Sequence, residues 1–347
     1  MNIGLTDEQK LLQDTASGLA ENLATTDPSD IPSGDTLADH WRQLVELGVP
    51  TLRSPSLCGL DASGVETVVV IEQLARTMCA VPVVGQAVFA TELLEAAGAH
   101  KELELIAEGS LRIAPILTVD LQRFGATEAG GVAFDAAGAT HALLAIESGG
   151  VHRLACAPLE DTTEEGLDLT RTLRRTPADV AASATTTGEP IDADRWHRVE
   201  ALALTATAAD LVGVMQGALD EAVRYAGDRV QFGVKIGSFQ AVQHMLADAL
   251  VRVEGARSCL WHAAWAIDHL PVDEARLAAM TAKAYAAAAG RDVVETAVQV
   301  FGGIAITWEH VSHLRVRRTL LNRRLFGDEA TLYEAVAQMR LENEELA

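Results

Sequence analysis

Arg229-Val-Gln-Phe-Gly233 and Gln299-Val-Phe-Gly-Gly303 are the two stretches that decide how this chain is interpreted. Each combines polar side chains with glycine, which lets a backbone approach a ligand closely or adopt a positive φ. The guanidinium of Arg229 can make paired hydrogen bonds to a diphosphate, and the amide of Gln299 can bind an adenine or a ribose. Both stretches stand at the ends of helical segments, and together they are suited to holding a dinucleotide.

The same stretches also have plainer interpretations, which the residues alone leave open. Arg229 can serve only to cap a helix C-terminus, and Gln-x-x-Gly-Gly is a common way to end a helix. Gln240 and His244 follow at the start of the next helical segment, one turn apart on one face. Gln240 is the better candidate for a ligand contact, because a lone histidine on a mostly apolar helix is more often a core or interface residue.

Hydrophobic periodicity around these stretches predicts four long helices that pack as an antiparallel bundle. Glycine or proline separates each segment from the next, as expected where helices end. The predicted helices span residues 198–228, 237–269, 273–299 and 308–345.

The remainder of the chain predicts a helical domain followed by a small β domain. Helical spacing begins at Leu5, where Thr6 is suited to be an N-cap, and continues to about Gly109. Short apolar runs between turn-rich segments then extend to about Thr187. We therefore expect a mainly α fold with a small β domain. Its predicted parts are an N-terminal helical domain (1–110), a β domain (111–190) and a C-terminal four-helix bundle (191–347).

Composition argues against several classes of partner. The chain has 347 residues and a formal charge of −22, so its overall field repels nucleic acid and anionic membrane surfaces. No apolar run approaches the roughly 20 residues that span a bilayer. The N-terminus also lacks the basic and apolar regions of a signal peptide. We expect a cytoplasmic protein that binds neither nucleic acid nor membrane.

Cysteine spacing predicts no metal site. Cys58, Cys79, Cys156 and Cys259 are widely separated and include no Cys-x-x-Cys pair, so neither zinc nor a disulfide framework is indicated. We expect buried, reduced thiols. His262 follows Cys259 by one helical turn, and chance is the simplest explanation of that proximity.

The order of helices, small β domain and four-helix bundle resembles that of the acyl-CoA dehydrogenases. Residues 229–233 and 299–310 are similar to segments with which that family contacts FAD. Trp41-Arg-Gln-Leu-Val-Glu-Leu-Gly48 and Asp168-Leu-Thr-Arg-Thr-Leu173 are similar to an opening helix and to the end of its β domain. The resemblance implies an FAD-dependent oxidoreductase that desaturates an acyl-CoA thioester and clamps an FAD bound mainly by a neighbouring subunit.

The resemblance also implies which residues contact that FAD. They are Arg229, Gln231, Phe232, Gln240, Gln299, Gly302 and Gly303. The last three of these contact its adenosine half.

The family's catalytic carboxylate is missing from both places where the resemblance puts it. Desaturation needs a carboxylate to take the α-proton while a hydride leaves to the flavin. In most members it lies in a Tyr-Glu-Gly phrase, where this chain has Phe326. In a minority it precedes an arginine in the first bundle helix, where this chain has Ala203 and Leu204. Asp328 and Glu329 are alternatives for a displaced base, although an acid near a helix start is more often structural.

The predicted β domain departs from the family as well. Residues 117–123 read Leu-Thr-Val-Asp-Leu-Gln-Arg and match none of the phrases that surround the flavin ring. These losses resemble the short, non-catalytic subunits of α2β2 acyl-CoA dehydrogenases from bacterial steroid (cholesterol) side-chain degradation. The resemblance implies that a catalytic homologue supplies the base and the ring pocket, with electron-transferring flavoprotein as electron acceptor. The alternatives are an autonomous homo-oligomer with a displaced base and a flavin-free scaffold subunit.

A basic run stands out in so acidic a chain. Its members are Arg315, Arg317, Arg318, Arg323 and Arg324. The run can attract CoA phosphates or a partner's acidic surface. The abundance of Asp and Glu favours ion pairs between helices instead.

Overall fold

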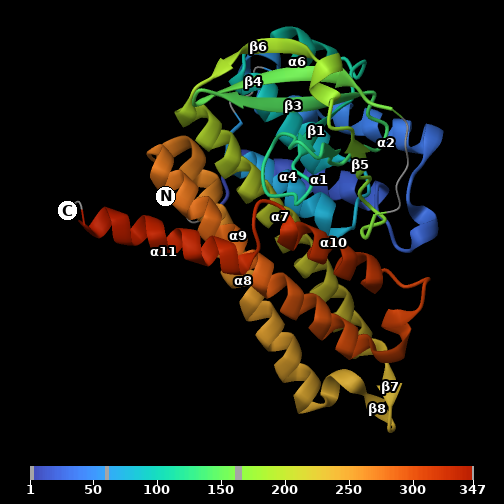
Figure 1. The fold of residues 1–347 in the computed structure, drawn as a ribbon. Coiled ribbons are helices and arrows are strands. Elements are labelled where there is room, and N and C mark those ends of the chain that lie inside the picture. The colour runs from blue at the N-terminus through green and yellow to red at the C-terminus, as the bar shows by residue number, and fades with distance from the viewer. Residues whose placement is uncertain (1–3, 59–61, 161–165, 346–347) are drawn as a thin grey trace.

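The computed structural model describes residues 4–58, 62–160 and 166–345. A helical N-terminal part and a small sheet lie at one end of a long helical bundle, and a short β hairpin lies at the other end (Figure 1). This arrangement confirms the mainly α fold with a small β domain.

Short helices around a buried core form the N-terminal part. The prediction for Thr6 is confirmed: its hydroxyl accepts a hydrogen bond from Gln9 N at 3.2 Å, and Thr6 N donates to Gln9 Oε1 at 2.9 Å. The helices are α1 (Asp7–Asn22), α2 (Gly34–Glu46), α3 (Pro55–Cys58), α4 (Gly64–Arg76), the π-helix η3 (Val83–Ala90), α5 (Thr91–Ala96) and α6 (His100–Ala107), with 3₁₀ turns η1 (Pro28–Asp30) and η2 (Val49–Thr51).

A six-stranded mixed sheet follows, with the strand order β5-β2-β1-β3-β4-β6. β1 and β3 are parallel, and the other neighbouring strands are antiparallel. Gly149 and Gly150 join β3 to β4 with φ of 65° and 79°, as a two-residue hairpin turn requires. The strands are β1 (Ile113–Leu117), β2 (Gly131–Ala133), β3 (His141–Ser148), β4 (Val151–Pro158), β5 (Arg174–Thr176) and β6 (Thr185–Ile191), with a 3₁₀ turn η4 (Val180–Ser183) before β6.

The C-terminal bundle is built on α7, which packs against α4, α8 and α9. Its helices are α7 (Ala193–Asp228), α8 (Gln240–His269), α9 (Val272–Phe301), α10 (Ser312–Arg324) and α11 (Glu329–Glu345), with 3₁₀ turns η5 (Ile236–Ser238) and η6 (Gly302–Ile306).

The predicted single helix over residues 308–345 is wrong, because the chain breaks between α10 and α11. Phe326 and Gly327 lie in the break with φ of 55° and 106°, a left-handed backbone that an α-helix does not allow. Asp328 then accepts hydrogen bonds from the backbone N–H and the hydroxyl of Thr331, at 3.0 and 2.9 Å, and caps α11. Periodicity concealed the break because it persists on both sides.

α7 is long and apolar enough to cross a membrane by length and composition alone. A buried core helix of a globular protein meets the same test, so this finding does not contradict the expectation that no segment spans a membrane. The most apolar window of α7 is 94% buried inside the protein. Its position at the centre of the bundle accounts for its composition.

Buried ion pairs centred on Arg171 join separate parts of the chain. The guanidinium of Arg171 lies 2.6 Å from Asp135, which follows β2, and 2.7 Å from Asp210 of α7. All three side chains are at most 4% exposed. One buried cation therefore holds the β domain to the bundle.

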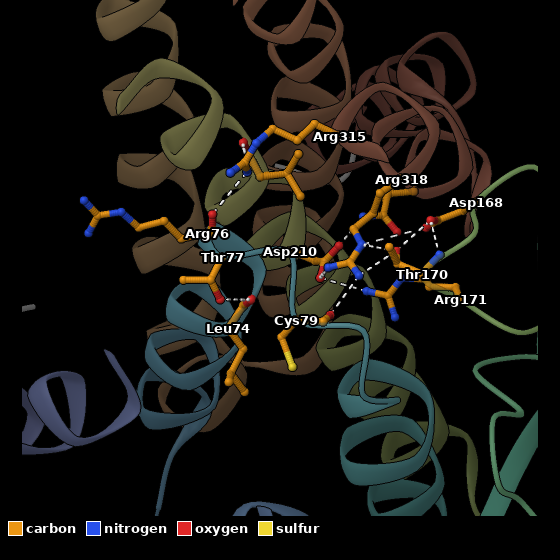
Figure 2. A network of polar contacts seen from close by, with 12 residues as sticks. Leu74, Arg76, Thr77, Cys79, Asp168, Thr170, Arg171, Asp210, Arg315 and Arg318 are labelled. Atoms are coloured by element: carbon orange, nitrogen blue, oxygen red, sulfur yellow. Dashed lines mark hydrogen bonds and ion pairs between the residues drawn. The ribbon is translucent and has the colours of Figure 1, made fainter. Parts of the chain in front are cut away.

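Arg318 of α10 completes this network (Figure 2). It donates to the hydroxyl of Thr170 at 2.9 and 2.6 Å and to the carbonyl oxygen of Cys79 at 2.8 Å. It also lies 3.8 Å from Asp168 and 3.9 Å from Asp210. Burial raises the pKa of Asp168. Burial acts in the same direction on Asp210, but the two arginines outweigh it and hold the pKa of Asp210 below its ordinary value.

Arg171→Ala tests the network, because it leaves Asp135 and Asp210 buried without their shared countercharge. Removing one member of a buried ion pair costs about 3–5 kcal/mol, and we expect the free energy of unfolding in denaturant titrations to fall by that amount. Arg317→Ala is the matched control, since among the described residues Arg317 donates only to the exposed carbonyl oxygen of Leu167 at 3.0 Å. That control should cost about 0.5 kcal/mol or less. Equal losses in the two variants would contradict the role given to Arg171.

Candidate functional site

Arg229, Gln231 and Phe232 lie on a short hairpin at the free end of the bundle (Figure 1). Its strands are β7 (Val230–Gln231) and β8 (Val234–Lys235). Phe232 and Gly233 form the turn with φ of 53° and 80°, the positive values that tight hairpins require. Phe232 is 93% exposed. The hairpin thus presents its side chains to solvent or to a partner.

The backbone of Arg229 caps α7 while its side chain remains available. The N–H of Arg229 donates to Tyr225 O at 2.8 Å, which ends the helix. The residue is exposed, and its guanidinium forms no ion pair with any described residue. Capping therefore explains the position of the residue but not its charge.

Gln299 lies in the last turn of α9, and Gly302 and Gly303 form an open turn directly after it. Gly302 has φ 67° and ψ −139°, a conformation that side-chain-bearing residues rarely adopt. A Cβ added at Gly302 or Gly303 would meet no atom within 4 Å, and Gln299 is exposed. The backbone of this turn is accessible to a ligand.

Aromatic contacts bring the two stretches to the same end of the bundle. Tyr225, one turn before Arg229, packs against Phe301, which directly precedes Gly302, with 5.2 Å between ring centroids. The ring of His310 lies 4.7 Å from that of Phe301. Segments far apart in the sequence therefore meet here.

Gln240 is the first residue of α8, and it is exposed. His244, one turn later, is also exposed. A core role for His244 is therefore wrong for the single chain, because its side chain lies on the exposed face of this turn while Val242 and Met245 pack inward. An interface role stays a prediction.

The residues at this end fit the polar half of FAD. We call them the clamp, and they are Arg229, Gln231, Phe232, Gln240, Gln299, Gly302 and Gly303. An available guanidinium suits a diphosphate, amides suit a ribose or an adenine, and open glycines allow close approach. Ile306 and Trp308 nearby in the chain are 81% and 58% exposed, and exposed apolar patches mark sites of association. The FAD contacts themselves stay a prediction.

Phe326 occupies the main base position and is part of an aromatic cluster. Its ring centroid lies 5.5 Å from that of Phe89 in η3 and 5.0 Å from that of Phe124 after β1. Phe89 and Phe124 are 5.7 Å apart. Three rings from three parts of the chain therefore fill this position, and none can accept a proton.

Residues 117–123 contact the α10–α11 loop directly. Phe326 N donates to Leu121 O at 2.9 Å, and Gln122 Nε2 donates to Arg324 O at 3.0 Å. The resemblance puts phrases that surround the flavin ring at the first segment and the catalytic base at the second. Because they hydrogen-bond to each other, this part of the chain does not fit a flavin ring.

The second base position is apolar and buried. Ala203 and Leu204 lie inside α7 and are 1% and 8% exposed. The carbonyl oxygen of Ala203 accepts an intrahelical hydrogen bond from the Thr207 hydroxyl at 2.8 Å. Neither side chain can take a proton.

Asp328 and Glu329, the alternatives for a displaced base, both have structural partners. The hydrogen bonds from Thr331 hold the pKa of Asp328 below its ordinary value. Burial acts to raise the pKa of Glu329, but its contact with Arg323 outweighs burial and the pKa is lowered. A carboxylate with a lowered pKa is a weaker base, so neither is suited to abstracting a proton from carbon.

Each arginine of the basic run has a partner within the chain. The contacts join Arg315 to Glu221, Arg317 to the carbonyl oxygen of Leu167, Arg318 to Thr170 and Cys79, Arg323 to Glu329, and Arg324 to Asp328. Arg315, Arg318, Arg323 and Arg324 each lie against a carboxylate, which confirms the ion-pair interpretation for these four. Among the described residues, Arg317 bonds only a carbonyl oxygen.

The cysteines whose side chains the structure describes are weak nucleophiles. Burial raises the pKa of Cys79 and Cys156 to about 11 and also raises that of Cys259. Cys79 is buried and the other two are partly buried. The side chain of Cys58 lies outside the described residues. Within residues 4–58, 62–160 and 166–345, no three His, Cys, Asp or Glu side chains gather as metal ligands would.

Lys283 of α9 is a buried ionisable group that no sequence motif indicated. It is fully buried, and its Nζ donates to Gly327 O at 3.1 Å and to Arg323 O at 3.4 Å. These hydrogen bonds satisfy carbonyl oxygens at and just after the C-terminus of α10. Burial lowers its pKa to about 7. A lysine within the alanine-rich run of α9 was the sequence signal that could have indicated a buried amine.

The clamp and the loop of Phe326 lie beyond opposite ends of α10. This helix has 13 residues and a length of about 20 Å. Gly302 precedes its start and Phe326 follows its end. The clamp is thus presented at the free end of the bundle, on the far side from the chain's own sheet (Figure 1).

Comparisons with known sequences identify related proteins. A sequence profile described as "Acyl-CoA dehydrogenase, C-terminal domain" matches residues 203–341. The acyl-CoA dehydrogenase IpdE2 of Mycolicibacterium smegmatis is 30% identical over 332 residues, which cover 93% of this chain and 96% of the relative. The acyl-CoA dehydrogenase FadE34 of Mycobacterium tuberculosis is 30% identical over 90% of this chain, which spans only 45% of that relative's length.

Solved structures share the fold over nearly the whole chain. A variant described as the Tcur3481-Tcur3483 steroid ACAD gives a TM-score of 0.81 at 24% identity, covering 98% of this chain and 99% of that one. The ChsE4-ChsE5 complex from Mycobacterium tuberculosis gives 0.74 at 22% identity, covering 99% of both chains. At these identities the likeness establishes the fold alone.

The buried amine of Lys283 predicts how stability changes with pH. Its pKa is about 7 in the folded chain and about 10.4 when unfolded. Between these values the unfolded chain binds a proton that the folded chain does not, so stability rises with pH. From pH 7 to pH 9 the native protein should gain about 2 kcal/mol relative to the Lys283→Met variant in denaturant titrations. The same pH response in both proteins would contradict this assignment.

Proposed function

Because the chain belongs to the acyl-CoA dehydrogenase family of flavoprotein oxidoreductases, we propose that it is the non-catalytic subunit of a heteromeric acyl-CoA dehydrogenase. It holds the adenosine and diphosphate of FAD. A homologous partner chain supplies the ring pocket and the catalytic carboxylate. Two copies of each chain make up the complex.

The contrast between the two ends of the bundle carries this proposal. At the free end, the clamp is exposed and has an unpaired guanidinium among the described residues. At the other end, Phe326 fills the base position, and its N–H bonds Leu121 where the resemblance places the ring. A chain that keeps the nucleotide site and closes the ring site is suited to serve a flavin in another subunit.

The clamp binds and orients but moves no proton. Arg229 makes paired, charge-assisted hydrogen bonds to the diphosphate. The amides of Gln231 and Gln299 bind the ribose or adenine, and Gly302 lets that half approach the backbone. When bound, FAD supplies the acceptor for the hydride that leaves the thioester's β-carbon. The α-proton goes to the partner's carboxylate.

A bulky acyl-CoA, such as a steroid side-chain thioester, is the proposed substrate. The support is the structural neighbour described as a steroid ACAD. Two neighbours are also described by pairs of chain names, one of them as a complex, which supports a heteromeric partner. A complex with one reaction site per pair of chains has room for a larger cavity around that site.

Arg229→Ala in the co-purified complex tests the clamp. Hydrogen bonds to a charged group contribute about 1.5–3 kcal/mol, so the dissociation constant of FAD should rise about 10- to 100-fold. Flavin fluorescence during stepwise dilution measures it. Arg42→Ala is the control, because Arg42 is an exposed arginine of α2 paired with Asp39 at 2.7 Å. Unchanged FAD affinity in an intact Arg229→Ala complex would favour the flavin-free scaffold.

Asp328→Asn and Glu329→Gln separate the shared site from an autonomous enzyme. If the partner supplies the base, both variants should keep kcat for acyl-CoA-dependent dye reduction within about twofold of the native complex. Loss of a general base would lower kcat by about 100-fold or more. Such a loss in either variant, or a yellow and active oligomer of this chain alone, would contradict the proposal.

A further inference from the structure

α11 packs along α9, and its C-terminal end reaches past the bundle (Figure 1). Its inner face packs against the core through Leu332, Ala335, Val336 and Met339. On its outer face Tyr333 and Leu341 are 43% and 63% exposed, and Ala337 between them is exposed as well. A helix with apolar side chains on both faces is typical of one that is covered again on assembly.

The outer face of α11 has a self-complementary order centred on Ala337. Tyr333 lies four residues before Ala337 and Leu341 four residues after it, while Glu334 lies three before and Arg340 three after. At 3.6 residues per turn all five share a stripe about 120° wide. An antiparallel copy that crosses at Ala337 places Tyr333 against Leu341 and Glu334 against Arg340. Two-fold symmetry makes each contact twice.

A groove of about 540 Å³ accompanies this face, between α8, α9 and α11. Leu277 and Ala278 of α9 line it together with Arg340, and the acidic residues Asp273 and Glu274 of α9 line it as well. The side chains of Glu334 and Arg340 are exposed and form no ion pair with any described residue. Both charges are therefore available to an occupant, and the small side chain of Ala337 permits close approach.

We infer that two copies of this chain associate through α11, antiparallel about a two-fold axis at Ala337. The charges favour a second copy of this chain as the occupant. Glu334 and Arg340 are equally spaced from the centre of the stripe, so in an antiparallel pair each acid meets the other copy's base. The inference rests on the proposed function only for the place of the contact, between the two copies of this chain in the α2β2 complex.

Charge reversal tests the pairing in the full chain, alone and in the complex. Arg340→Glu brings like charges together at both ends of the contact and should weaken self-association about tenfold or more in sedimentation velocity. Glu334→Arg should do the same. The double variant Glu334→Arg/Arg340→Glu should restore native association, which also shows that the single variants fold.

Ala337→Cys tests the position of the axis. A cysteine on the axis faces its own copy, and a disulfide forms when the two Cα atoms are about 4.4–6.8 Å apart. Under mild oxidation this variant should cross-link into dimers. Gln338→Cys is the control, because the next residue is also exposed but points about 100° away. The native protein controls for its own cysteines.

Single charge variants that associate as the native chain does, or cross-linking at residue 338 instead of 337, would overturn the inference. Charge variants that release the partner chain would also overturn it, by assigning α11 to that partner. If the flavin-containing complex assembles equally well with the charge variants, the inference about α11 is contradicted and the proposed function is not. If the chain pairs through α11 but forms no flavin-containing complex, only the proposed function is contradicted.

Discussion

The buried pairing of Arg171 and Arg318 with three aspartates is the constraint on which the rest of the structure depends. Arg318 lies within α10 and bonds the carbonyl oxygen of Cys79 and the hydroxyl of Thr170 (Figure 2). Arg171 holds the same β-domain segment to Asp210 of α7. Charges this deeply buried are tolerated only when paired, so α10 has one position relative to the helical and β parts.

Because α10 has a fixed position, the segments at its two ends have fixed positions as well. The turn at Gly302 precedes it, and the loop of Phe326 follows it. Because a helix is rigid along its axis, neither end can approach the other. A nucleotide held at one end is therefore kept away from the chemistry that the other end would have to perform. This separation agrees with the proposed function, in which the chain binds the nucleotide half of the flavin while aromatic rings fill the position of the base.

Much of the fold follows from local pattern, because helical periodicity and short apolar runs are local properties. The clamp residues are recognisable from their motifs for the same reason. That they meet, however, depends on Tyr225 packing against Phe301, a contact between distant segments. The left-handed break at Phe326 interrupts a periodicity that continues on both sides, so the pattern predicted one helix.

The partners of the buried polar groups could not be predicted from the sequence for a related reason. Arg318 and Cys79 are 239 residues apart, and Lys283 and Gly327 are 44 apart. Pairing over such separations is set by tertiary packing and leaves no periodic trace. The same packing pairs arginines of the basic run with other residues of the chain, such as Arg315 with Glu221 at 2.6 Å.

The ratio of flavin to protein in the assembled complex tests the central claim most directly. We predict one FAD for each pair of unlike chains, and no tightly bound FAD when this chain is purified alone. One FAD for every copy of the isolated chain, bleached on addition of acyl-CoA, would show that its own ring site is open and would contradict the account.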